Sequence, residues 1–211
     1  MKHFTIYFFV VLMVIINTSC SKPYKNSEKL IGIQVYRGFD KTLLDSICNA
    51  IERVHGCKTV WLTEKQLPSS AFVQIKSPRY RADSLIRILR REKPDSLFLV
   101  IGLTHQDIST TKRDVEGNVL SPAFKYEDWG VFGLGYLGKP GCVVSTYRIQ
   151  NVTKAKLISR MQKICVHELG HNRGLPHCPT PHCVMQDAVE RVQTVDDANL
   201  EFCEKCRSKL R

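Results

Sequence analysis

The stretch 167–177, HELGHNRGLPH, constrains the fold of this chain more than any other part of it. His167 and His171 are four residues apart, so on a helix they share one face and can bind the same ion. Gly174 can adopt the left-handed conformation that ends a helix, and the resulting turn would bring His177 back to that ion. The pattern therefore predicts a helix, a sharp turn and a three-histidine zinc site with one coordination position left for water.

Glu168 follows the first histidine of this pattern, and we expect it to lie beside the ion rather than to bind it. A carboxylate in that place can take a proton from a water molecule at the zinc and pass it to a leaving amine. This predicts hydrolysis of peptide bonds with Glu168 as the general base. A bare H-E-x-x-H pentad also arises by chance on helix surfaces, but the added Gly174 and His177 disfavour that alternative.

Four of the nine cysteines follow the histidine motif closely, at Cys178, Cys183, Cys203 and Cys206. The last two form a C-x-x-C pair, a spacing typical of metal sites. Four thiolates can complete a tetrahedral structural zinc site, which has no open position and stabilises a fold without catalysing a reaction. Disulfide pairing is the competing interpretation if the protein is exported, because exported cysteines meet oxidants.

The segment from His167 to Cys206 resembles the archaemetzincin family of metallopeptidases. It contains H-E-x-x-H-x-x-G-x-x-H-C, then C-x-M and C-x-x-C, at the spacings of that family, and the upstream stretches VFGLGYLG and VVSTYR are also similar to it. The resemblance implies a compact metzincin fold with two zinc ions, one catalytic and one bound by the four cysteines. It also implies that Met185 forms a turn beneath the catalytic metal, whereas the sequence alone is equally compatible with core packing of this methionine.

The same resemblance implies where a substrate would bind. A strand within residues 130–148 would form the upper rim of the cleft, and an extended peptide could add to its edge as a further strand. Aminopeptidase and endopeptidase activity both remain open at this point. An aminopeptidase needs an acidic group for the substrate's amine, and Glu127, Asp128 and Asp187 are candidates, with ordinary exposed surface as the alternative for each.

Residues 1–20 have the layout of a secretory signal peptide. Lys2 precedes an apolar run that is too short for a comfortable membrane span, and small residues lead to Cys20. This resembles a bacterial lipoprotein signal with Cys20 as the lipidated residue, although Asn17 stands where an aliphatic residue is usual. We therefore expect an exported lipoprotein on a bacterial membrane, with residues 21–29 as a polar tether. Plain secretion and an uncleaved anchor are the alternatives, and a cytoplasmic location is less favoured.

Residues 30–211 are expected to form one domain in which strands and helices alternate. Strands are predicted at 30–36, 59–62 and 96–103, and as two segments within 130–148 that are broken at 139–141. Helices are predicted after Asp40 to about residue 55, at 81–93, and after Thr153 to about residue 173. Residues 68–80 and 109–122 are expected to be loops. This order predicts an α/β fold with a mixed sheet.

The net charge of +11 raises the question of nucleic-acid binding, but the basic residues are scattered and no nucleic-acid-binding motif is present. We therefore expect a peptide or protein substrate, no nucleic-acid partner and a monomer. The competing function is a catalytically silent zinc-binding lipoprotein that acts as a binding or scaffold module. Nothing in the motif favours it, because Glu168 and all three histidines are present.

Overall fold

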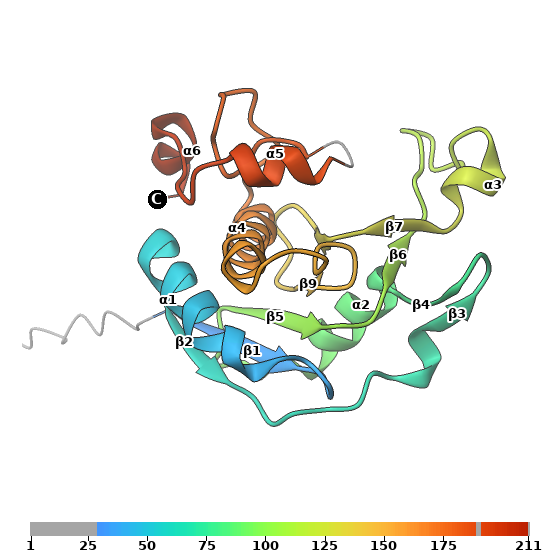
Figure 1. Cartoon of the computed structure of the whole chain (residues 1–211), viewed down its shortest axis with the longest axis horizontal. Coiled ribbons are helices and arrows are strands. Elements are labelled where there is room, and N and C mark those ends of the chain that lie inside the picture. Colours follow the sequence, from blue (N-terminus) through green and yellow to red (C-terminus); the bar gives the residue numbers. More distant parts are fainter. Residues whose placement is uncertain (1–28, 189–190, 211) are drawn as a thin grey trace, which may run out of the picture.

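The computed structural model describes residues 29–188 and 191–210, and its centre is a five-stranded mixed sheet (Figure 1). The strands lie in the order β2 (Lys58–Trp61), β1 (Leu30–Val35), β5 (Leu99–Thr104), β9 (Cys142–Ser145) and β8 (Gly133–Gly135). The first four run parallel to one another, whereas β8 is antiparallel to β9 and forms one edge of the sheet. The predicted α/β fold with a mixed sheet is confirmed.

Helices cover both faces of this sheet. Side chains of β1, β5 and β9 alternate, so Ile33 and Ile101 pack with α1 (Leu44–His55) and α4 (Lys154–Asn172) in one core cluster. Val143, on the opposite face, packs in another cluster with residues of α2 (Ala82–Glu92). Burial on both faces explains the nearly continuous apolar run that predicted β5.

Two side-chain caps set the start of the predicted helices. Asp40 accepts a hydrogen bond from the backbone N–H of Thr42 (2.9 Å) and starts the short 3-10 helix η1 (Lys41–Leu43), which leads into α1. Thr153 accepts one from the backbone N–H of Lys156 (3.4 Å) at the start of α4. Both are the cap residues expected from the sequence, since each satisfies an N–H that has no partner within its helix.

A second, four-stranded sheet was not predicted. Its strands lie in the order β3 (Phe72–Gln74), β4 (Pro78–Arg81), β6 (Ile108–Thr110) and β7 (Trp129–Val131), and η2 (Ser69–Ala71) and α3 (Ala123–Tyr126) accompany it. The expected loop at 68–80 is therefore wrong, and residues 130–148 take part in three strands instead of two. These strands are only three or four residues long, so their own periodicity is too short to reveal them. β3 and β4 pair locally as a hairpin, whereas β4 with β6 and β6 with β7 pair across longer stretches of the chain.

The carboxy-terminal segment passes over α4 and carries two short helices, α5 (Val192–Asp197) and α6 (Glu204–Ser208) (Figure 1). Within residues 29–188 and 191–210, no helix is both long and apolar enough to cross a membrane. The predicted signal peptide, with Cys20, and all but the last residue of the predicted tether lie outside the described residues.

Candidate active site

The three motif histidines converge where α4 ends. One nitrogen from each of His167, His171 and His177 lies within 4.8 Å of the others, and the ring centroids are 4.6 to 5.4 Å apart. His167 and His171 share a face of α4, as their spacing requires. Gly174, with a φ of 90°, turns the chain back so that His177 meets them. The three rings form a donor set for a single metal ion.

Backbone carbonyls fix the orientation of two of these rings. Nδ1 of His167 lies 2.8 Å from the oxygen of Val184, and Nδ1 of His171 lies 2.7 Å from the oxygen of Leu175. A carbonyl oxygen can only accept a hydrogen bond, so Nδ1 carries the proton in each ring and Nε2 keeps its lone pair. Burial, together with the neighbouring histidine, lowers the pKa of His167 to about 3, and burial also lowers the pKa of His171. Both rings are therefore neutral, as metal ligands must be.

Glu168 lies between α4 and the edge strand β8, in contact with two glycines. A Cβ atom added at Gly133 would lie 2.8 Å from Oε1 of Glu168, so a larger residue would collide with the carboxylate. Burial raises the pKa of Glu168 to about 8, and a hydrogen bond from the backbone N–H of Gly135 partly opposes that shift. The carboxylate is thus a stronger base than an exposed glutamate.

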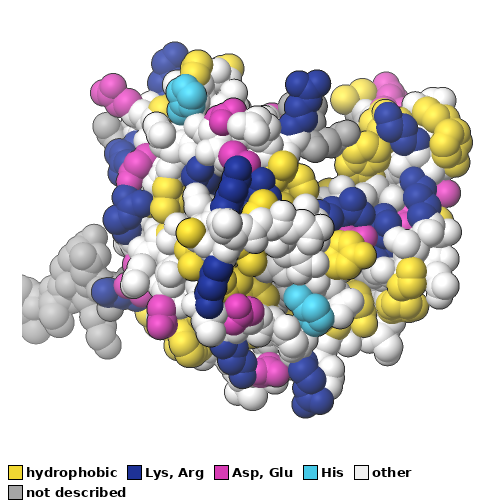
Figure 2. All heavy atoms as spheres, viewed as in Figure 1, with side chains coloured by type: hydrophobic (Ala, Val, Ile, Leu, Met, Phe, Trp, Pro, Cys, Tyr) yellow, Lys and Arg dark blue, Asp and Glu magenta, His cyan; other side chains and the backbone are white. Residues whose placement is uncertain are grey.

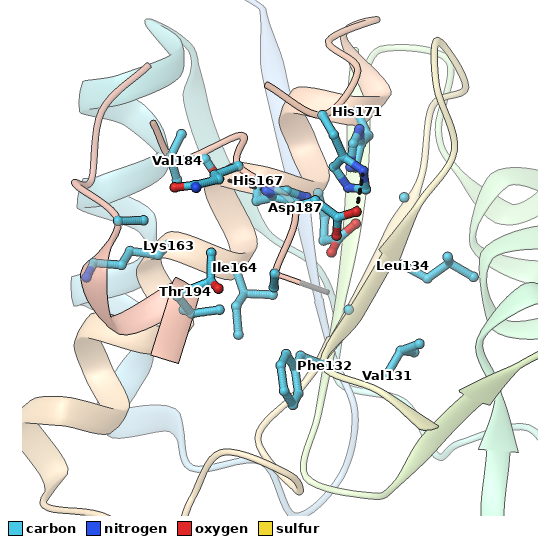
Figure 3. A pocket seen from close by; sticks show the side chains of 18 of the residues that line it. Val131, Phe132, Leu134, Lys163, Ile164, His167, His171, Val184, Asp187 and Thr194 are labelled. Atoms are coloured by element: carbon cyan, nitrogen blue, oxygen red, sulfur yellow. Dashed lines mark hydrogen bonds and ion pairs between the residues drawn. The ribbon is translucent and has the colours of Figure 1, made fainter. Parts of the chain in front are cut away.

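These groups line a cleft of about 890 Å³. One wall is the rim segment, which we define as residues 129–137, and the opposite wall comes from α4 and from residues within 184–188 and 192–198. Figure 3 shows His167, His171 and Asp187 close together, with Phe132 and Val131 farther along the rim segment. His177 is half exposed, and its Nδ1 lies 3.4 Å from Oδ2 of Asp187. The cleft is large enough to take several residues of a peptide.

Met185 is fully buried beneath the histidine-bearing end of α4. A Cβ atom added at Gly170 would lie 2.4 Å from the Met185 sulfur, so the two residues are in direct contact. The backbone N–H of Gln186 donates to the oxygen of Cys183 (2.9 Å), which closes a turn around Met185. Met185 therefore lies in a turn and also packs in the core.

The four carboxy-terminal cysteines form a second group of donors, with all four sulfurs within 4.8 Å of one another. The Sγ atoms of Cys178 and Cys203 are 3.7 Å apart, and those of Cys183 and Cys206 are 3.9 Å apart. A disulfide has a sulfur–sulfur distance of about 2.05 Å, and no cysteine in the described part of the chain forms a disulfide. Burial opposes ionisation of Cys203, but hydrogen bonds from the Cys206 backbone and from neighbouring side chains lower its pKa to about 6.

Comparison with known proteins identifies the family. The sequence model of peptidase family M54 matches residues 28–211, which is most of the chain. The chain belongs to peptidase family M54. Archaemetzincins are similar to this M54 peptidase: that of Halobacterium salinarum is 30% identical over 168 residues, covering 75% of this chain and 86% of its own. That of Haloquadratum walsbyi is 32% identical over 170 residues, covering 76% and 87%. The predicted family is confirmed, and this M54 peptidase is a zinc metallopeptidase.

Solved structures share the fold of this M54 peptidase. Archaemetzincin from Methanopyrus kandleri superposes with a TM-score of 0.72 at 24% identity, covering 88% of this chain and 95% of its own. Archaemetzincin from Archaeoglobus fulgidus, solved in complex with malonate, gives 0.67 at 24% identity, covering 85% and 99%. At this level of identity the similarity establishes the fold.

The acidic residues considered for binding a substrate amine lie in different environments in this M54 peptidase. Asp128 is neither such a group nor exposed surface, because it is buried 3.4 Å from Nη1 of Arg79 and 3.6 Å from Nη1 of Arg81. Glu127 is not among the described residues that line the cleft. Asp187 does line it, beside the third motif histidine, and is the remaining candidate.

Sequence reasoning missed Asn172, which is buried one residue after the second motif histidine. Its amide donates to the oxygens of Tyr136 (3.3 Å) and Gly141 (3.1 Å), which ties the end of the rim segment to α4. A signal was available, because Asn172 follows Glu168 by four residues and so shares its helix face. Arg148, which lines the cleft, was missed as well, and no helix spacing relates it to the motif residues.

Proposed function

We propose that His167, His171 and His177 hold the catalytic zinc ion of this metallopeptidase, and that Glu168 is its general base. The observation that carries the proposal is the convergence of three imidazoles beside one buried carboxylate in an open cleft. Two of the rings are fixed as neutral donors by backbone carbonyls. Three protein ligands leave a coordination position for water, as catalytic zinc sites require.

Zinc, when bound, supplies Lewis-acid chemistry, since it acidifies a water molecule and polarises a substrate carbonyl. Glu168 takes a proton from the attacking water, and the hydrogen bond from Gly135 holds the carboxylate in place while it does so. The protonated Glu168 then donates this proton to the nitrogen of the leaving amine. Burial favours the protonated form of the carboxyl group, so Glu168 can keep the proton between the two steps.

The substrate is a peptide or protein, and we propose that it binds in extended form along β8. One side of β8 pairs with β9, and its other side forms the edge of the five-stranded sheet. The residues of β8 also line the cleft. A peptide that adds to this edge through backbone hydrogen bonds would pass directly over Glu168.

A comparison of wild type with Glu168→Gln tests the catalytic proposal. Glutamine has nearly the same shape but cannot act as a base, so we expect hydrolysis to fall about 10²–10⁴-fold while zinc content is unchanged. Purified proteins would digest a peptide library, with cleavage products identified by mass and zinc measured by elemental analysis. Glu116→Gln, at an exposed position outside the cleft lining, is the matched control. Full activity in Glu168→Gln would show that the chemistry lies elsewhere.

We propose that a second, structural zinc ion is held by Cys178, Cys183, Cys203 and Cys206. Four sulfurs this close together match the donor set of a closed tetrahedral site, and the lowered pKa of Cys203 favours a thiolate in the set. The group packs with Val184 and Phe202 in a core cluster, as expected for a structural site.

We also propose that the protein is exported and lipidated at Cys20. The support is the order of positive charge, apolar run, small residues and cysteine in residues 1–20. Cells that express wild type or Cys20→Ser would be fractionated, and we expect wild type in the membrane fraction and the variant released from it. Equal recovery of both proteins in the soluble cytoplasmic fraction would contradict the proposal.

A further inference from the structure

The charges that line the cleft are unevenly distributed. Among the described residues that line it, the acidic ones are Glu168 and Asp187, and both lie at the histidine end. The basic lining residues are Lys112, Arg148 and Lys163. Figure 2 shows Lys and Arg side chains gathered in the hollow between α5 and the region of α3. The stretch of the cleft beside Trp129 and Gly130, which Lys112 and Arg148 line, is therefore basic.

Arg148 is held rigidly in that stretch. Its Nε and Nη2 atoms donate to the two carboxylate oxygens of Asp107, at 2.7 and 2.8 Å. Asp107 is buried and also contacts Nε of Arg79 at 3.3 Å. This pairing uses one edge of the guanidinium group and leaves Nη1 outside it. Arg148 is a third exposed, so part of the guanidinium group faces the cleft.

The rim segment is shaped around this arginine. A Cβ atom added at Gly130 would lie 2.0 Å from Cζ of Arg148, so the guanidinium lies directly against the Gly130 backbone. Glycine at this position therefore lets Arg148 reach the cleft. Beside it, Nζ of Lys112 lies 4.3 Å from the ring centroid of Trp129, and both residues line the cleft. The ammonium group thus stays at the Trp129 end of the rim segment, where Gly130 meets Arg148.

The length of the rim segment between Gly130 and Gly133 gives the approximate distance from Glu168 to Arg148. Gly133 contacts Glu168, and Gly130 contacts Arg148. Three residues of extended chain span roughly 10 Å at most. A peptide bound along the rim segment has the same rise per residue, so a group about three positions from the cleaved bond would reach Arg148.

We propose that Arg148 and Lys112 form a carboxylate-binding subsite, so that this peptidase selects substrates with a carboxylate about three residues from the cleaved bond. The carboxylate is that of an acidic side chain or of the substrate's own carboxy terminus, since both have the same recognition chemistry. A preorganised guanidinium group, with a second cation lining the same cleft, suits this ligand. The inference rests on the proposed function, because it uses the same cleft and the same path for the peptide.

The test uses full-length protein and fluorogenic peptides in matched pairs, with Glu or Gln at each position up to four residues from the cleaved bond. Each pair is made with a free or an amidated carboxy terminus. We expect kcat/KM to be about tenfold higher for the peptide that carries the carboxylate near the third position, as for a charge-assisted hydrogen bond. A preference for internal Glu assigns an acidic side chain, and a preference for the free terminus assigns the chain end.

Arg148→Gln should reduce this preference to near one, and Lys112→Ala should reduce it without disturbing the ion pair of Arg148 and Asp107. Lys112→Ala therefore keeps the test valid if Arg148→Gln folds poorly. Arg91→Gln, an exposed arginine on α2 outside the cleft lining, is the matched control and should keep the preference. Equal rates for all pairs in wild type would overturn the proposal, as would an unchanged preference in both variants.

Peptide binding separates this inference from the proposed function. Fluorescence anisotropy with Glu168→Gln measures the affinity for each peptide without hydrolysis, and we expect the same tenfold preference. If wild type cleaves no peptide but binding keeps a preference that depends on Arg148, the catalytic proposal fails and the subsite stands. If peptides are cleaved and neither affinity nor rate depends on the carboxylate, the subsite fails and the catalytic proposal stands.

Discussion

At the scale of single residues, Gly170 and Met185 pack in direct contact beneath the site. The methionine side chain is fully buried and occupies the space that any side chain at position 170 would need. Gly170 precedes His171, and Met185 follows Val184, whose carbonyl orients His167. This contact therefore couples the helix that carries two histidines to the loop that orients one of them.

Gly170→Ala should lower stability by about 1–3 kcal/mol, because its Cβ atom would lie 2.4 Å from a buried sulfur and the loop around Met185 would have to move. In a protein of this size the Tm should fall by roughly 2–12 °C, which thermal denaturation can measure. The double variant Gly170→Ala with Met185→Val should be less destabilised than the sum of the two single variants. Strictly additive losses would show that the two side chains do not compete for space.

At the scale of elements, α5 is attached to α4 by a largely buried ion pair. Arg160 of α4 donates from Nε and Nη2 to the two carboxylate oxygens of Asp196, at 2.7 and 2.8 Å. Lys163 of α4 donates to the backbone oxygen of Asp196 at 2.8 Å. Because α5 has only six residues, these contacts rather than its own helix propensity hold it over the cleft.

The substitution Asp196→Asn tests this attachment, because it should change how the stability of the protein depends on pH. Hydrogen bonds from Arg160 and Lys156, together with their charges, lower the pKa of Asp196 to about 2, against about 4 in an unfolded chain. Because its pKa is depressed in the folded protein, the ionised Asp196 carboxylate stabilises the fold above pH 4. This stabilisation is lost as the pH falls from about 4 to 2. We expect the D196N variant to be less stable than wild type by about 1–2 kcal/mol at pH 7, allowing for solvent screening.

The measurement is urea denaturation of wild type and D196N between pH 7 and pH 2, and the difference between the two proteins should narrow below pH 4. D197N changes the neighbouring exposed carboxylate, which accepts a hydrogen bond from Gln193 within the same helix, and should show a much smaller difference at pH 7. If D196N were less stable than wild type by the same free energy at every pH, the stabilising role of ionised Asp196 would be refuted.

At the scale of the whole molecule, the carboxy-terminal segment forms part of the cleft wall and packs over α4. Its Phe202 packs edge-to-face with His55 at the end of α1. Arg173, just after α4, donates to the oxygen of Leu210 (3.1 Å) and to that of His55 (2.8 Å). The four cysteines lie in the core of this region, so a metal there would fix both the segment and the turn that carries His177.

The protein should therefore contain about two zinc ions per chain, and its four carboxy-terminal cysteines should be recovered as free thiols after denaturation in chelator. Cys203→Ser should lose the structural zinc, lower stability and weaken the catalytic zinc as a secondary effect, because structural zinc contributes folding energy. His177→Ala should remove the catalytic zinc and activity with a smaller loss of stability. Elemental analysis and thiol titration measure these quantities.

Cys48→Ala removes a cysteine outside the cluster and is the control, with one thiol fewer and an unchanged zinc content. One zinc per chain with the four cysteines oxidised would instead describe a single-metal peptidase whose carboxy-terminal segment is held by disulfides.

The sequence by itself determined the helix that carries His167, Glu168 and His171, because helix geometry places residues four apart on one face whatever surrounds them. It also determined the central parallel strands, whose apolar runs reflect burial on both faces. Glycine at position 174 indicated the turn toward His177, since few other residues adopt a φ of 90°. Each of these depends on neighbours in the sequence.

Only the tertiary structure decided what depends on distant partners. α5 is held by α4, and the hairpin of β3 and β4 joins a sheet only through the distant strand β6, so a short stretch such as 68–80 looks like a loop when read alone. Aspartate is usually exposed, but Asp128 is buried, and two arginines about 50 residues earlier in the chain compensate its charge. Arg148 reaches the cleft only because Asp107 and Gly130 are brought beside it by the fold.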